Sequence, residues 1–352
     1  MKIGHGWYLG TLVTLLLLLP VANIWSQSAP ITAKELVENS ALKSHADELK
    51  RGEIILITQP ENVIRSQLNV VMAVLAPASL EKTVDTLQRQ ATAEDGPGIL
   101  AIGEIKPSSA SDPAKAFSGV AFSPGEKNEA EKMMAVAPGD DFNFSRDEIA
   151  MIQKRAKTAK NGDKNGPAAI SAMSLAMRDV LKGRYLAYQE NGLEGLAPYQ
   201  AGPSKQISPS QELISATESL HLLKERFPDY YSCLRFYPEK QPAKLVHHIF
   251  WAKQMESGRP LFMLKHWVLD VSADQALITE RRFYLDHSLS SLQVIIGCLP
   301  HHGSTLVVLL NQAFTEKVDM TIGKSIARAI GYREVEKNIR PMFENLQAAL
   351  RR

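Results

Sequence analysis

Five strand-like segments follow one another in the last third of the chain, and this run constrains the fold more than any other feature. Each segment is rich in β-branched and aromatic residues, which favour strands. Parallel neighbours need long crossovers, so the short turns between these segments predict an antiparallel meander. The segments are LVHHIFWAKQM, PLFMLKHWVLDV, ALITERRFYLDH, SLQVIIGCL and TLVVLLNQAFTEKV.

The segments on either side of this run complete the expected architecture. EIILIT, QLNVVMAVLA and ILAIGEI are apolar, short and bounded by proline or charged residues, which is typical of strands. PASLEKTVDTLQRQ carries apolar residues at helical spacing, and so does the long terminal segment KSIARAIGYREVEKNIRPMFENLQAALRR. We therefore predict an α+β fold in which an antiparallel β-sheet grips a long C-terminal helix.

The middle of the chain is expected to be a mostly helical insertion. Ser145 and Glu148 have the spacing of a capping box that starts one helix. A second helix is expected over residues 208–227, ended by Pro228, and an amphipathic helix over residues 32–52. The predicted division is a signal peptide (1–28), the first part of the α+β domain (29–125), the helical insertion (126–235), and the meander with the C-terminal helix that completes the domain (236–352).

The N-terminus has the pattern of a secretory signal. The apolar run WYLGTLVTLLLLLPVANIW is interrupted by Pro20 and followed by Ser26 and Ser28, small residues that fit cleavage before Ala29. We predict an exported protein, periplasmic or extracellular, with no stable membrane span after cleavage. The alternative is an uncleaved N-terminal membrane anchor, for which the run is only just long enough.

Charge and cysteine content limit the remaining possibilities. The 352 residues carry 40 basic and 38 acidic side chains, a formal net charge of +2, so nothing favours nucleic acid or an anionic membrane as partner. Only Cys233 and Cys298 occur. In an oxidising compartment they form one disulfide, or they are two buried thiols, and the sequence leaves both open.

Two resemblances bear on the fold and the function. VVMAVLAPASLEKTVDTL resembles the first strand and helix of START-related helix-grip proteins (the SRPBCC-like group), and REVEKNIRPMFENLQAAL resembles their closing helix. That resemblance implies a cavity for an apolar or amphipathic, lipid-like small molecule. GRYLAYQENGLEGLAPY and RRFYLDHSLSSL are similar to segments of a set of exported bacterial proteins, which implies export and no particular chemistry.

Strand alternation selects candidate ligand-binding residues. Alternate residues of a strand share one face, and both faces of PLFMLKHWVLDV and ALITERRFYLDH are largely apolar, so this sheet needs a cover on each side. A C-terminal helix that covers one face loosely would leave a pocket. Its predicted lining is Phe262, Leu264, His266, Phe283 and His287. The alternative is that these residues are packed core whose histidines are hydrogen-bonded.

Metal and catalytic sites are not predicted. His247 and His248 point to opposite faces of a strand, His301 and His302 lie in a turn, and alternation separates His287 from its neighbour Asp286. The sequence also lacks a nucleophile elbow, a phosphate-binding loop and a dinucleotide fingerprint, so we predict no catalytic residue and no cofactor.

The leading hypothesis is an exported, non-catalytic protein that binds an apolar or amphipathic small molecule. One alternative is an enzyme on the same scaffold that uses His266 or His287 as general acid or base. Another is a cell-envelope interaction module that docks through residues 126–235. The oligomeric state is left open.

Overall fold

The computed structural model describes residues 31–59, 64–92, 98–106, 113–162, 166–319 and 323–351. The predicted signal peptide over residues 1–28 lies outside these ranges. Among the helices that they contain, none is long and apolar enough to cross a membrane.

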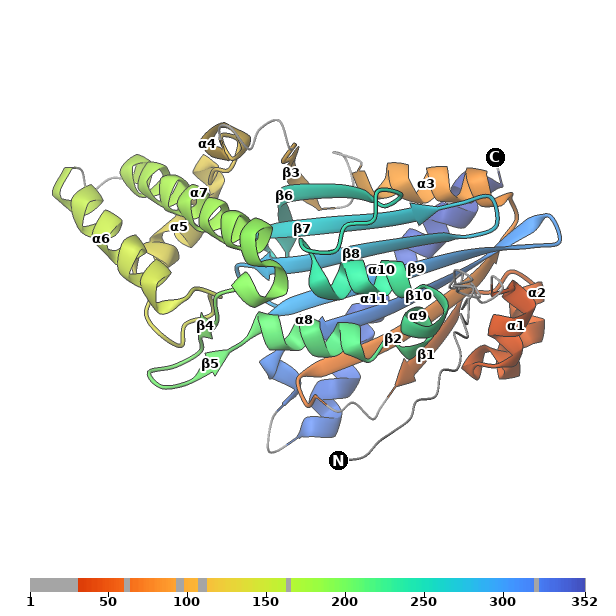
Figure 1. Cartoon of the computed structure of the whole chain (residues 1–352). Coiled ribbons are helices and arrows are strands. Elements are labelled where there is room, and N and C mark those ends of the chain that lie inside the picture. The colour runs from red at the N-terminus through yellow and green to blue at the C-terminus, as the bar shows by residue number, and fades with distance from the viewer. Residues whose placement is uncertain are drawn as a thin grey trace, which may run out of the picture.

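One antiparallel sheet of eight strands organises the molecule (Figure 1). All five strands of the predicted meander form, each paired with the next, and the α+β prediction is confirmed. In spatial order the strands are β1 (Ile55–Gln59), β2 (Gln67–Ala76), β10 (Ser304–Phe314), β9 (Ser291–His301), β8 (Ala276–Leu285), β7 (Arg259–Val271), β6 (Val246–Glu256) and β3 (Ile99–Glu104).

Two helices from opposite ends of the chain cover one face of the sheet. They are α3 (Leu80–Thr92) and the long α11 (Lys324–Leu350), which contact each other. Phe343 and Leu346 of α11 and Val84 of α3 form one buried cluster with sheet residues such as Trp267 and Val307. In Figure 1, α11 lies behind the sheet. We call this side the α11 face.

The other face is covered by helices from the middle of the chain. Figure 1 shows α8 and α10 in front of the sheet, and α8 contacts both β8 and β9. We call this side the α7 face, after the longest helix of this layer. The layer comprises α5 (Lys127–Met134), α6 (Arg146–Gly162), α7 (Gly166–Asn191), α8 (Pro209–Glu218), α9 (His221–Arg226) and α10 (Pro228–Phe236), with η3 (Pro124–Glu126), η4 (Gly192–Gly195) and the hairpin of β4 (Tyr199–Gln200) and β5 (Gln206–Ile207). The remaining elements are α1 (Ala33–Glu38), η1 (Ala41–His45), α2 (Ala46–Lys50), α4 (Pro113–Ala116) and η5 (Glu316–Val318).

Two predicted helices are interrupted. The helix expected over residues 32–52 is three short helices, because the Ser40 hydroxyl accepts from the Leu42 amide and starts a new turn. The helix expected over 208–227 divides into α8 and α9, and Pro228 begins α10 as well as ending α9. A proline has no amide hydrogen, so it fits the first position of a helix without losing a hydrogen bond.

The predicted capping box at the start of α6 is confirmed. The Ser145 amide donates to Glu148 Oε2 at 2.6 Å, and the Glu148 amide donates to Ser145 Oγ at 3.3 Å.

Cys233 and Cys298 are both free and buried. Cys233 lies on α10 in a cluster on the α7 face, whereas Cys298 packs on the α11 face, so the sheet separates the two thiols.

The end of α7 depends on one glycine. Gly192 has φ 58, and a Cβ there would lie 1.7 Å from the carbonyl oxygen of Tyr237. We expect Gly192→Ala to lower the free energy of unfolding by at least about 2–3 kcal/mol in urea titrations, because backbone must move. The matched control is Gly183, which is exposed within α7 and where a Cβ would meet no heavy atom within 4 Å. Gly183→Ala should stabilise by about 0.5–1 kcal/mol; equal effects of the two changes would contradict this account.

Candidate functional site

The five predicted ligand residues are all buried; Phe262, Leu264, His266 and Phe283 lie on the α7 face, whereas His287 lies beyond the end of β8. Phe262 meets the ring of Phe122 at a centroid distance of 5.0 Å, and Phe283 stacks on Tyr188 of α7 at 4.0 Å. Leu264 belongs to the same cluster. The expectation that the C-terminal helix covers this set is therefore wrong, because alternation identifies residues that share a face but not the helix that covers them. Their role in ligand binding stays a prediction.

His266 belongs to a chain of hydrogen bonds that runs from Arg281 to Cys233. Its Nδ1 lies 2.9 Å from Tyr188 Oη, and its Nε2 lies 3.0 Å from His247 Nδ1. Arg281 Nη1 donates to the Tyr188 hydroxyl at 3.4 Å, which leaves that hydroxyl its own proton to donate to His266 Nδ1; in that arrangement His266 Nε2 donates to His247 Nδ1. The chain ends where His247 Nε2 lies 3.8 Å from Cys233 Sγ. Burial lowers the pKa of His266 well below its ordinary value, in keeping with this neutral arrangement.

Arg281 is buried among neutral acceptors. Its guanidinium donates to Gln293 Oε1 at 3.1 and 2.7 Å and to Thr217 Oγ1 at 3.1 Å. No carboxylate of the described residues forms an ion pair with it. Burial raises the pKa of Cys233 to about 11, so the end of the chain is a thiol and not a nucleophilic thiolate. These contacts join α7, α8 and α10 to the sheet.

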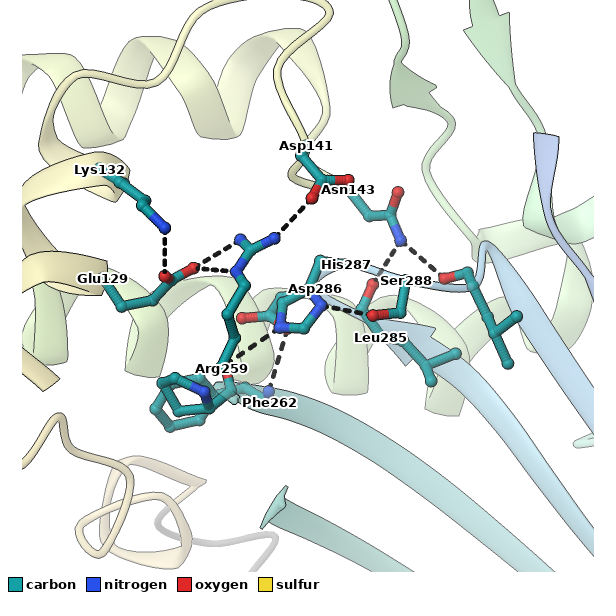
Figure 2. Close-up of polar contacts among 12 residues, drawn as sticks. Glu129, Lys132, Asp141, Asn143, Arg259, Phe262, Leu285, Asp286, His287 and Ser288 are labelled. Atoms are coloured by element: carbon teal, nitrogen blue, oxygen red, sulfur yellow. Dashed lines mark hydrogen bonds and ion pairs between the residues drawn. The ribbon is translucent and has the colours of Figure 1, made fainter. Parts of the chain in front are cut away.

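His287 lies at the end of β8 in a different polar cluster (Figure 2). Its Nε2 donates to the carbonyl oxygen of Pro260 at 3.2 Å, so Nδ1 is free to accept from the Ser288 hydroxyl at 2.7 Å. Asp286 Oδ1 lies 3.7 Å from His287 Nε2 and accepts from the Phe262 amide at 3.0 Å. The predicted separation of Asp286 from His287 is wrong, because β8 ends at Leu285 and alternation stops there.

The loop that carries Ser288 is held in an unusual conformation. Ser288 has φ 71, a left-handed region that costs a residue with a side chain about 1–3 kcal/mol. Asn143 braces the loop, since its Nδ2 donates to the carbonyl oxygens of Leu285 and Leu289 and its amide donates to that of Asp286. Figure 2 shows Arg259 beside this loop, between Glu129 and Asp141.

A charged cluster lies on the α11 face of β7 and β8. Glu280 accepts from Arg282 Nε at 2.6 Å and from Trp267 Nε1 at 2.9 Å, and Lys265 Nζ lies 3.8 Å from it. Burial opposes ionisation of Glu280, but the charges of Arg282 and Lys265 outweigh it and lower its pKa to about 2. Sequence reasoning missed this cluster. The signal was present, since three charged residues interrupt one apolar face of two neighbouring strands.

The strand register extends this cluster into a row across the sheet. Trp267 pairs with Glu280, Glu280 with Val294, and Val294 with Asn311. Asn311 is 3% exposed, and its Nδ2 has no hydrogen-bond partner among the described residues. An unmet buried donor costs about 1–3 kcal/mol.

Several apolar side chains of the α11 face near this row are only half-buried. Val294 and Ile296 are half-buried although they lie on β9, an interior strand. The apolar residues of α11 in the same cluster, Val335, Ile339 and Met342, are half-buried as well. Side chains of both layers are therefore partly exposed to solvent.

Comparison with known proteins adds little. No family model matches the chain, and no curated protein matches it. Among solved structures, Ara h 8.0201 is similar with 11% identity over 40% of this chain and 87% of that chain, at a TM-score of 0.21. A TM-score this low carries no argument about fold or function.

Within the described residues, no group of three or more His, Cys, Asp or Glu side chains is placed to hold a metal ion.

Glu212 of α8 is a buried carboxyl group against the start of β9. Its oxygens accept from the hydroxyl groups of Ser290 and Ser291 at 2.7–2.8 Å. Burial is the main cause that raises its pKa to about 7, and the negative charge of Glu316 adds to it. Glu212 and His287 therefore have pKa values shifted in ways that make folding depend on pH.

We expect the two groups to change stability with pH in opposite directions. Burial lowers the pKa of His287 to about 4. Between about pH 6.5 and 4, His287 is therefore protonated in the unfolded chain but stays neutral in the folded protein. His287 thus destabilises the fold by about 2 kcal/mol at pH 5 relative to pH 7.5. His287→Asn should remove that loss in urea titrations at the two pH values.

Glu212 gives the opposite slope. Between about pH 4.5 and 7 the unfolded carboxyl group is ionised while the folded one stays protonated, so stability falls as pH rises. Glu212→Gln should remove about 2 kcal/mol of that loss between pH 5 and 7.5. Identical pH profiles for both variants and the unaltered protein would contradict these assignments.

Proposed function

We propose that the protein is an exported, non-catalytic binding protein for an apolar or amphipathic small molecule, and that its site lies between α11 and β8–β9. One observation carries this proposal: Val294 and Ile296 are half-buried on an interior strand beneath a covering helix. Protein interiors are packed about as densely as organic crystals, so side chains in a filled layer of this kind would be buried.

The chemistry of the surrounding residues supports a ligand of this class. Small-molecule sites are mainly apolar, with a few polar groups that fix orientation. Here Val335, Ile339 and Met342 of α11 supply apolar surface opposite β9, and the Glu280 cluster and Asn311 supply polar groups on the sheet. The place also agrees with the helix-grip resemblance, which implies a ligand between the sheet and the closing helix.

A neutral fluorescent probe tests the proposed site. We expect N-phenyl-1-naphthylamine to bind the purified protein saturably, and Val294→Trp to weaken binding at least tenfold because the indole fills the space beside β9. The matched control is Val271→Trp, at a residue that is 49% exposed at the end of β7, which should leave binding unchanged. Absence of saturable binding, or equal binding by both variants, would refute the proposal.

A second function is favoured by the contact between Ser288 Oγ and His287 Nδ1 at 2.7 Å. In acyl transfer, Ser288 would attack an ester carbonyl carbon while His287 takes the hydroxyl proton and returns it to the leaving alkoxide; water would then release the acyl group. The strained backbone of Ser288 supports this alternative.

The role of residues 126–235 as a docking surface for a cell-envelope partner stays a prediction.

A serine-directed fluorophosphonate tests this second function. Acyl transfer predicts a covalent adduct on the peptide that contains Ser288, found by mass spectrometry and lost in Ser288→Ala. Ser290→Ala, two residues away, is the control and should keep the adduct. A protein that remains unlabelled after prolonged incubation rules the serine mechanism out.

A further inference from the structure

The charges of the Glu280 cluster do not cancel. Lys265 and Arg282 contribute two positive charges, and Glu280, ionised at neutral pH, contributes one negative charge. On α11, Glu336 and Arg340 are close in sequence to Val335, Ile339 and Met342. They form an ion pair with each other at 2.6 Å, so their charges cancel. Lys265, Arg282 and Glu280 therefore sum to a net charge of +1. On the same face, Glu104 is in register with Lys265 through Phe250, and its Oε1 lies 2.7 Å from His248 Nδ1.

Arg282 is the group through which this excess charge is accessible. Only its Nε is bonded, to Glu280, and its two terminal nitrogens have no partner among the described residues. The side chain is 25% exposed. A guanidinium presents paired N–H groups in a rigid plane, which suits a planar two-oxygen anion better than a single acceptor.

Asn311 supplies an independent sign that a polar group is missing from this face. Its unpartnered Nδ2 is two strands from Glu280, with only Val294 between them in the row. Strands are spaced by about 4.8 Å, so the two side chains stand on the order of 10 Å apart. That donor is buried.

We propose that the ligand is a monoanionic amphiphile, with Arg282 holding its head group and its apolar tail lying along Val294, Ile296 and α11. This inference rests on the proposed function. A monoanion cancels the net +1 charge of the cluster. A dianion would leave −1, a cation would raise the charge to +2, and a neutral head would leave the guanidinium nitrogens without an acceptor. A carboxylate fits the guanidinium of Arg282 best, because its two oxygens can each accept from one N–H group.

Probes that share one 12-carbon tail separate these head groups. Displacement of N-phenyl-1-naphthylamine from the full protein is measured with dodecanoate, dodecanol, methyl dodecyl phosphate, dodecyl phosphate and dodecyltrimethylammonium. We expect dodecanoate to bind at least tenfold more tightly than dodecanol, and the dianion and the cation to bind more weakly than dodecanoate. The phosphodiester separates any monoanion from a carboxylate: binding equal to dodecanoate assigns the site to monoanions in general.

Substitution of Arg282 tests the residue itself. Arg282→Gln should remove the preference for dodecanoate over dodecanol and leave dodecanol binding unchanged, which also shows that the variant is folded. Arg333→Gln, at an exposed position of α11, makes the same change in net charge and should keep the preference. If dodecanol binds as well as dodecanoate to the unaltered protein, the head-group inference fails while the proposed function stands. If no probe binds, both fail.

Discussion

Every part of this protein depends on an antiparallel sheet whose two faces are both largely apolar. Such a sheet is stable only when each face is covered. One cover comes from α3 and α11, which are separated by most of the chain, and the other comes from helices α5–α10 in its middle. In sequence, the five strands of the meander β6–β10 lie between α10, on one face, and α11, on the other. The chain therefore forms the meander before its last helix covers the second face.

The two covers place different side chains against the sheet. On the α7 face, aromatic rings meet the sheet directly, and the hydrogen-bond chain from Arg281 to His247 satisfies polar groups in the core. On the α11 face, Val294 and Ile296 stay half-buried and the Asn311 amide lacks a partner within the described ranges. Half-buried apolar residues in both layers, next to the Glu280 cluster, are the reason we place the proposed ligand on the α11 face.

The sequence predicted local structure well because local structure has local causes. The period of two in β7 and β8, the turns between strands and the Ser145 capping box each depend on residues close together in the chain. The covering of each face has no such signal. Phe262 and Met263 are both large, apolar and buried, yet they pack on opposite faces, and alternation treats the two faces alike.

The wrong helix was expected over the predicted ligand residues for the same reason. Histidines in an apolar strand point to His266 and His287. Alternation also places Glu280 and Arg282 on a largely apolar face, but it does not say which residues lie beside them. Their meaning depends on the register that brings Lys265 and Trp267 alongside them, which pairing across the sheet decides and sequence spacing does not. Asn311 became informative only when its unmet hydrogen bond was visible.

The most direct test of the account is a crystal structure of the protein soaked with 12-bromododecanoate, whose bromine can be located by anomalous scattering. The account predicts the carboxylate at the terminal nitrogens of Arg282 and the bromine between α11 and β9. A bromine located among α7, Phe262 and Phe283, or no ordered bromine at saturating concentration, would contradict it.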